Sequence, residues 1–203
     1  MPVSRPIPAS KPRPVVKLKP ESKLELIMNP VRIRILTALS NQKLTTHQLA
    51  IEIPDIPQTT LYRQINTLVE NGLIQVAEEN PIRGTVERVY QIDRAVNLTD
   101  DDLNSLRKKD LEQLVSVMIG SLLSEAKVFL SAMPDQGDVK PLAQGIEFAK
   151  TSLFLNGTEF EELNKKMHEV IHSYAKLPAG EDRKRMVFSY FFIPVVSNTE
   201  KRY

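Results

Sequence analysis

The 203-residue sequence contains no cysteine. Disulfides, thiolate metal sites, iron–sulfur clusters and cysteine nucleophiles are therefore excluded, and thiol-based redox sensing with them. No run reaches the 18 uninterrupted apolar residues that a membrane-spanning helix needs, and the first residues lack the apolar core of a signal peptide. These absences predict a soluble cytoplasmic protein without a membrane partner.

Motifs for common enzymatic chemistry are also missing. None of the seven glycines belongs to a phosphate-binding loop, which disfavours a nucleotide-binding enzyme. The sequence has no nucleophile elbow of the serine hydrolase type. We therefore expect no cofactor and no enzymatic activity.

Charge is balanced overall but unevenly distributed along the chain. Residues 1–20 contain five basic residues, six prolines and no acid, which predicts a disordered basic tail. Residues 21–98 carry eight bases and nine acids, whereas residues 99–203 carry 14 bases and 16 acids. A chain of this length forms one or two small domains, and we expect them at residues 21–98 and 99–203.

Residues 21–98 begin with signals for short helices. A helical pattern covers residues 21–28, and Asn29 followed by Pro30 predicts the start of another helix. That helix has an apolar stripe which leaves Arg32 and Arg34 off it. The stripe consists of Val31, Ile35, Leu36 and Leu39.

Two further helices and a hairpin are predicted next. Thr45 and Gln48 form a capping-box pattern that opens a helix, and the prolines of residues 54–57 end it. A third helix runs to Asn71-Gly72, and strands are expected at residues 73–79 and 86–92 around a turn at residues 80–84. This order of elements is that of a winged helix-turn-helix. The stripe of the third helix consists of Leu61, Ile65, Leu68 and Val69.

Three stretches of this region together resemble ArsR-type regulators: NPVRIRIL at 29–36, TTLYRQINTLVENGLI at 59–74 and GTVERVY at 84–90. The resemblance covers residues 29–92. It implies a DNA-binding transcriptional regulator, usually a dimer, with the third helix in the major groove and the wing beside the phosphate backbone. Pro57 departs from the pattern, since it offers no capping oxygen. Metal sensing is not carried over, because the metal-sensing members rely on cysteines.

The third helix must turn its apolar stripe to the core, which leaves a polar face outward. Gln and Asn can bond adenine, Arg can bond guanine or phosphate, and Thr and Tyr commonly contact phosphates. A solvated helix face is the plain alternative. On the wing, the resemblance implies phosphate or minor-groove contacts, with pairing to Glu87 as the alternative. The predicted DNA-binding residues are Thr46, Gln58, Thr59, Thr60, Tyr62, Arg63, Asn66, Arg83 and Arg88.

The basic tail has two interpretations. It is either a cationic arm that lies along DNA and raises affinity through counterion release, or an inert solvated end. The sequence favours neither.

The second half opens with Thr99 and three aspartates, a pattern that favours a helix start. A long apolar stripe extends from there to about Met133 and is too long for one small wing domain to cover. We therefore predict a homodimer through this helix, with burial under the rest of residues 99–203 as the alternative. The stripe consists of Leu103, Leu106, Leu111, Leu114, Val115, Met118, Leu122, Ala126 and Phe129.

A strand at residues 146–155, a helix at 158–177 and a strand at 186–196 are predicted to complete a small α+β module. Aromatic residues of this module either line a ligand pocket or, as is more common, form plain core. They are Phe148, Phe154, Phe188, Tyr190 and Phe192.

One motif in this module suggests zinc. His168-Glu169-x-x-His172 matches the H-E-x-x-H pattern of metalloproteases. The apolar stripe of that helix leaves both histidines on a wet flank, and few acidic residues remain to supply a third ligand. A metalloprotease is therefore disfavoured, no metal is expected, and the two histidines are only weak candidates for a metal site.

Taken together, the sequence predicts a mainly α protein with a small β component. Its predicted function is a sequence-specific DNA-binding regulator, a dimeric repressor of transcription controlled by an unidentified small-molecule ligand. The alternative is a winged-helix module for protein interaction that does not bind DNA.

Overall fold

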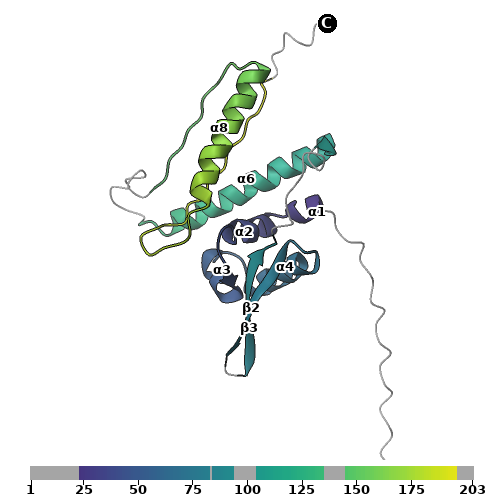
Figure 1. Ribbon diagram of the computed structural model, residues 1–203, viewed down its shortest axis with the longest axis vertical. Coiled ribbons are helices and arrows are strands. Elements are labelled where there is room, and N and C mark those ends of the chain that lie inside the picture. The colour runs from purple at the N-terminus through teal and green to yellow at the C-terminus, as the bar shows by residue number, and fades with distance from the viewer. Residues whose placement is uncertain (1–22, 83, 94–103, 135–144, 196–203) are drawn as a thin grey trace, which may run out of the picture.

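The computed structural model describes residues 23–82, 84–93, 104–134 and 145–195 (Figure 1). The protein is mainly α-helical with one small antiparallel sheet, as predicted. The tail at residues 1–20, Arg83 and the helix start expected at Thr99 lie outside the described residues. The elements are α1 (Lys23–Ile27), α2 (Pro30–Ala38), β1 (Leu44–Thr45), α3 (Thr46–Glu52), α4 (Gln58–Glu70), β2 (Ile74–Ile82), β3 (Thr85–Ile92), α6 (Lys108–Ser131) and α8 (Gly157–Ala175).

The predicted helix starts in the first half are confirmed. The Oδ1 atom of Asn29 accepts hydrogen bonds from the backbone N–H groups of Val31 (3.0 Å) and Arg32 (3.1 Å), which caps α2. At α3 the capping box is complete, because the Thr45 N–H donates to the Gln48 side chain (2.8 Å) and the Gln48 N–H donates to the Thr45 hydroxyl (3.2 Å). These side chains satisfy backbone donors that the first turn of a helix leaves unpaired.

Helix α4 is capped differently at its two ends. It begins after Pro57 with no side-chain cap, as expected for a proline at this position. At its end, the N–H of Leu73 donates to the carbonyl of Leu68 (2.9 Å), and Gly72 takes a positive φ of 71°. Glycine adopts this left-handed conformation with little steric strain, so the helix ends where the sequence predicts.

The sheet contains a strand that the sequence pattern did not predict and a longer hairpin than expected. Its order is β1-β3-β2, with all neighbours antiparallel, and the two-residue strand β1 pairs with β3 through Leu44 and Tyr90. Strand β2 continues through residues 80–82, which were predicted to be turn. Pro81 is tolerated there because β2 is an edge strand, where a missing donor can face solvent.

The core of the winged unit, residues 23–93, is built from the predicted stripes. Helices α2, α3 and α4 close over the sheet and bury aliphatic side chains from every element. Arg34 is also buried, with only 3% of its surface exposed, although it lies off the apolar stripe of α2. The fully buried aliphatic residues include Ile35, Leu39, Leu49, Leu61, Ile65, Leu68, Leu73 and Ile74.

Helix α6 crosses the winged unit and lies against α2 (Figure 1). It begins at Lys108, where the Asp110 carboxylate accepts hydrogen bonds from both the backbone N–H and the Nε of Arg107. Its stripe is divided. Leu114 and Met118 face α2, whereas most of the other stripe residues from Leu111 onward remain exposed or half-buried.

Among the described residues, α6 is the one helix long and apolar enough to cross a membrane by length and composition. A single helix of this kind is a weak sign of a membrane segment, because core helices of soluble proteins share these properties. The contact of α6 with α2 accounts for part of its apolar surface.

The C-terminal helix α8 is confirmed, but the two strands predicted beside it are wrong. Residues 146–155 and 186–195 run along α8 without belonging to any strand (Figure 1). Their β-branched and aromatic composition favours extended backbone, but a strand also needs a hydrogen-bonded neighbour, and among the described residues neither segment pairs with one. The predicted α+β module is therefore a helix flanked by irregular segments.

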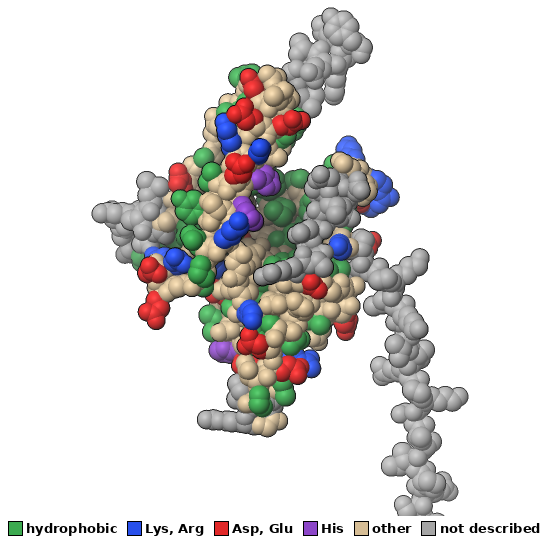
Figure 2. Space-filling view, in the orientation of Figure 1, with side chains coloured by type: hydrophobic (Ala, Val, Ile, Leu, Met, Phe, Trp, Pro, Cys, Tyr) green, Lys and Arg blue, Asp and Glu red, His purple; other side chains and the backbone are tan. Residues whose placement is uncertain are grey.

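The aromatic residues of this part do not form a buried core. Phe148 and Phe154 are 86% and 98% exposed, so they are neither core nor pocket residues. The others form a chain of ring contacts against α8, in which Phe192 lies 5.3 Å from Phe160 and 5.7 Å from Tyr190 between ring centroids. In Figure 2, apolar side chains are exposed over α8 and toward α6.

Candidate DNA-binding surface

Helix α4 has the two faces that its sequence predicts. Leu61, Ile65 and Leu68 are fully buried against the sheet and the neighbouring helices. On the opposite side, the predicted polar side chains are exposed, and we call this set the recognition face. It consists of Gln58, Thr59, Tyr62, Arg63 and Asn66.

Two predicted residues lie beside the recognition face rather than on it. Thr60 is half-buried. Thr46, the first residue of α3, is 8% exposed, so its side chain offers little surface to a ligand. For these two residues DNA contact stays a prediction.

A partly buried hydrogen bond that the sequence did not predict fixes α4 against α2. The Nε of Arg32 donates to the Oε1 of Gln64 at 2.8 Å, and Gln64 is buried. Gln64 follows Leu61 by three residues, so helical spacing alone could have placed it on the inner side. This pair orients the helix and leaves Gln64 unavailable to DNA.

The turn between α3 and α4 is held by a buried arginine of α2. Arg34 donates from Nη1 and Nη2 to the two carboxylate oxygens of Asp55, at 2.7 and 2.6 Å. The hydrogen bonds from Arg34 lower the pKa of Asp55, and partial burial opposes this only in part. Such a bidentate pair fixes direction as well as distance, so it holds the turn that leads into the uncapped start of α4.

The ion pairs of the wing differ from the Glu87 pairing that the sequence left as the alternative to DNA contact. Arg88 pairs with Glu79 across the hairpin (3.0 Å), where the register places the two residues opposite each other, and not with Glu87. Lys43 pairs with Glu78 at 2.8 Å. All four side chains are about half-exposed, and exposed pairs of this kind contribute little to stability. Arg88 can therefore exchange its partner for a phosphate at small cost.

The histidine pair of α8 shows no metal-binding arrangement within the described parts of the chain. His168 and His172 are exposed, as expected for a wet flank, and the Nε2 of His168 lies 2.9 Å from the hydroxyl of Tyr190. No group of three His, Cys, Asp or Glu residues that could hold a metal ion occurs among the residues described.

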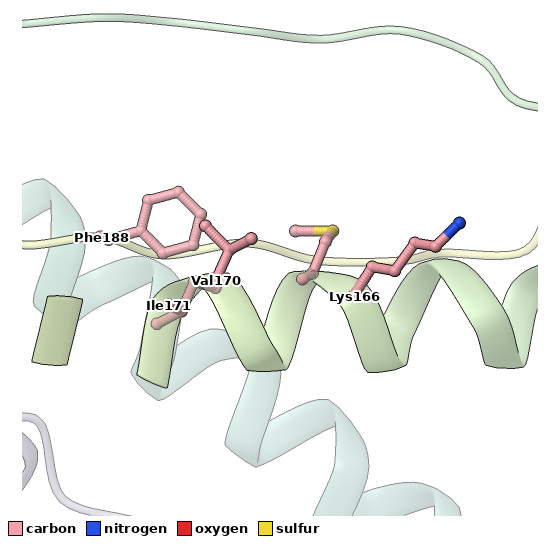
Figure 3. Close-up of a pocket in the computed structure, with 5 residues that line it drawn as sticks. Lys166, Val170, Ile171 and Phe188 are labelled. Carbon is pink, nitrogen blue, oxygen red and sulfur yellow. The ribbon is translucent and has the colours of Figure 1, made fainter. Parts of the chain in front are cut away.

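Two shallow apolar depressions lie away from α4. One, of about 320 Å³, lies on α8, where Lys166 and Phe188 mark its two ends (Figure 3). Of the aromatic residues predicted for a pocket, only Phe188 lines it. The other, of about 420 Å³, lies between α2 and α6 and includes Leu36, Leu114 and Met118.

Comparison with known families agrees with this geometry. Residues 27–77 match a family described as a helix-turn-helix domain, from the end of α1 to the first wing strand. A search of curated proteins gives no significant match. The chain thus contains a helix-turn-helix domain of the winged type, which supports DNA binding in transcription regulation; regulators with such domains are typically not enzymes.

Proposed function

We propose that this protein is a sequence-specific DNA-binding regulator of transcription that reads the major groove with α4. The observation that carries the proposal is the recognition face: an exposed polar surface on the helix that follows a clamped turn and precedes a wing. Residues 21–98 would be the DNA-binding domain. The winged-helix interaction module without DNA binding remains the alternative.

Each side chain of the recognition face has a chemically matched partner on a duplex. Gln58 and Asn66 offer the paired donor and acceptor that fit adenine, and Arg63 offers the fork that fits guanine. Thr59, Thr60 and Tyr62 supply hydroxyls for phosphates. On the wing, Arg83 and Arg88 would contact the phosphate backbone, and Thr46 would contribute at the start of α3.

The resemblance to ArsR-type regulators belongs to this proposal. It rests on the three motifs within residues 29–92, and the capped helices α2 and α3 and the β2–β3 hairpin agree with it. The absence of cysteine leaves no thiolate site for metal sensing.

We further propose that the protein acts as a homodimer through α6. Five of its apolar side chains follow the alternating four- and three-residue spacing of helices that pack in pairs. A contiguous exposed apolar surface commonly marks a site of protein interaction. The residues in this seam are Val115, Ile119, Leu122, Ala126 and Phe129, the largest of which are at least one-third exposed.

Repression controlled by a small molecule is the final part of the proposal. A dimer bound at its site excludes other proteins from that DNA, which is the simplest mode of repression. The depression between α2 and α6 supports ligand control, because an apolar ligand there would touch both the winged unit and the dimer helix. Residues 99–203 would then serve dimerisation and effector binding.

Selection from random duplex DNA tests the proposal. The purified full chain is incubated with random duplexes at low and moderate salt, and the retained DNA is sequenced. We expect an inverted repeat whose half-sites lie about one helical turn, or a multiple of it, apart. Retention without enrichment would indicate a non-specific binder, and no retention even at low salt would favour the protein-interaction module.

Two arginine variants separate base readout from phosphate contact. Arg63→Ala is expected to weaken binding to the selected site by about 1–3 kcal/mol, because removing the guanidinium fork removes base discrimination. Arg83→Ala should weaken binding to all DNA sequences alike, because it removes one phosphate contact. The slope of log affinity against log salt concentration, here called the salt slope, should fall by about one in magnitude. Fluorescence anisotropy over a salt series measures both. Unchanged affinity in both variants would contradict the proposal that this surface binds DNA.

The basic tail gives a third measurement. Residues 21–98 have no excess of bases, so an arm on DNA would supply much of the phosphate neutralisation. Deleting residues 1–20 should then reduce the salt slope by about 0.9 for each phosphate that the arm neutralises in the full chain. As the matched control, the five tail bases are replaced by glutamine with every proline kept. If the tail is inert, both proteins will bind like the full chain.

A further inference from the structure

The helix-turn-helix is tied to the C-terminal part of the chain by an ion pair. The Nε of Arg185, in the segment that follows α8, lies 2.8 Å from the Oε2 of Glu52, the last residue of α3. About one-third of each side chain is exposed, so the pair is neither fully solvated nor buried. A residue 133 positions away in the sequence thereby contacts the end of α3, directly before the turn that leads into α4.

A third element contributes a charge to the same place. Glu125 of α6 is half-buried, and burial raises its pKa, while Arg34 and Arg185 act in the opposite direction and Asp55 acts with burial. The carboxylate therefore lies within electrostatic reach of both arginines. The Nε of Arg34 is buried and has no hydrogen-bond partner among the described residues, so its positive charge is not fully satisfied by Asp55.

Two ion pairs flank the α3–α4 turn, Arg34 with Asp55 and Arg185 with Glu52. Glu125 of α6 lies within electrostatic reach of both arginines. We call these two arginines and three carboxylates the hinge network. Because α4 has no side-chain cap at its start, the position of this turn determines where the helix begins and how the recognition face is presented. The hinge network consists of Arg34, Glu52, Asp55, Glu125 and Arg185.

We propose that Arg185 is a positioning residue for DNA recognition: through Glu52 and the hinge network, the C-terminal segment holds the α3–α4 turn in the geometry that binds DNA. This inference rests on the proposed function, and it names the part of the chain that controls the DNA-binding surface. A change in the C-terminal part that moves Arg185 would then change the affinity of α4 for its site.

Arg34 is unsuited to testing this link. Its replacement would leave the Asp55 carboxylate without its partner at a partly buried position and could unfold the winged unit. The Arg185–Glu52 pair is more exposed, so breaking it should leave the fold intact. A change in DNA affinity without a change in thermal stability is therefore the signature of a positioning role.

A charge swap on the full chain provides the experiment. Arg185→Glu alone places two carboxylates side by side and should weaken binding to the selected DNA site about fivefold or more, a typical size for coupling between sites. Glu52→Arg alone places two guanidinium groups side by side. It should lower the affinity for the selected site relative to the affinity for random duplex DNA. The double variant restores opposite charges and is expected to recover most of that relative affinity. Lys184→Glu, at the exposed neighbouring residue, is the matched control.

Two further measurements keep the outcomes distinct. Thermal unfolding should be nearly the same for all four variants. Amide exchange at the start of α4 should be faster in Arg185→Glu and in Glu52→Arg, but not in the double variant or in Lys184→Glu. Wild-type affinity in Arg185→Glu, or no recovery in the double variant, would overturn the inference. If the wild-type chain binds no DNA, the proposed function fails instead, and the exchange at α4 still decides whether Arg185 positions the turn.

Discussion

Replacing Ile119 by glutamate is expected to turn a dimer into a monomer. Ile119 lies within the exposed seam of α6 and, at 51%, is the most exposed residue of the seam in a single copy. In a two-fold dimer the substitution would bury two carboxylates without partners, which costs at least about 3 kcal/mol. The dissociation constant of the dimer should therefore rise about 100-fold or more. Sedimentation velocity over a concentration series measures the change.

The matched control is Gln113→Glu, which adds the same charge to an exposed polar position of the same helix. This variant should sediment like the wild type. Binding to the inverted repeat should fall in Ile119→Glu, because each half-site is then bound by a separate monomer, while binding to one half-site persists. A wild-type chain that sediments as a monomer at all concentrations would contradict the proposed interface.

The second large effect is expected in the core of the winged unit. Ile65→Ala removes a fully buried side chain from the centre of α4, the helix that carries the recognition face. Truncations of this kind leave a cavity and lower the free energy of unfolding by about 2–5 kcal/mol. The shift should be visible as a lower midpoint of urea unfolding, followed by far-ultraviolet circular dichroism.

Ile51→Ala is the control for this truncation. It removes the same atoms from α3, where the side chain is 64% exposed, and surface substitutions usually change stability by no more than about 0.5 kcal/mol. Equal losses of stability in the two variants would mean that the burial described for α4 does not hold in solution.

The first half of the fold was predictable because its determinants are local. Asn29, the Thr45 and Gln48 pair and Gly72 each fix a helix end through contacts within a few residues. The buried face of α4 follows from helical spacing alone, and so does the recognition face opposite to it. The β hairpin was predicted with the correct strands but the wrong turn, because the breaker residues at 80–82 are accommodated in an edge strand.

The second half was predicted less well because its segments lack strand partners among the described residues. Residues 146–155 and 186–195 have the composition of strands, but composition does not reveal whether a hydrogen-bonded neighbour exists. The apolar stripe of α6 was recognised, whereas its division between α2 and the exposed seam depends on how two distant helices cross. Both the absence of strand pairing and the division of the α6 stripe depend on how distant segments are placed in the fold, which no local sequence pattern encodes.

The candidate site shows the same division. Sequence spacing placed the five residues of the recognition face correctly on the surface. The pairs that hold this face in place, Arg32 with Gln64 and Arg34 with Asp55, join residues more than 20 positions apart. An arginine next to an apolar stripe is commonly exposed, so burial of Arg34 required knowledge of where Asp55 lies.

The short strand β1 also has a consequence for the order of folding. Most contacts of the winged unit are made within single helices, between neighbouring helices or across the β2–β3 hairpin, and such local structure forms quickly. The pairing of Leu44 with Tyr90 instead closes a loop that contains α3, α4 and the first wing strand. Closing that loop costs chain entropy, and the closure gains the pairing of only two residues. We therefore expect β1 to join the sheet last. Variants of Leu44 should therefore speed unfolding more than they slow folding.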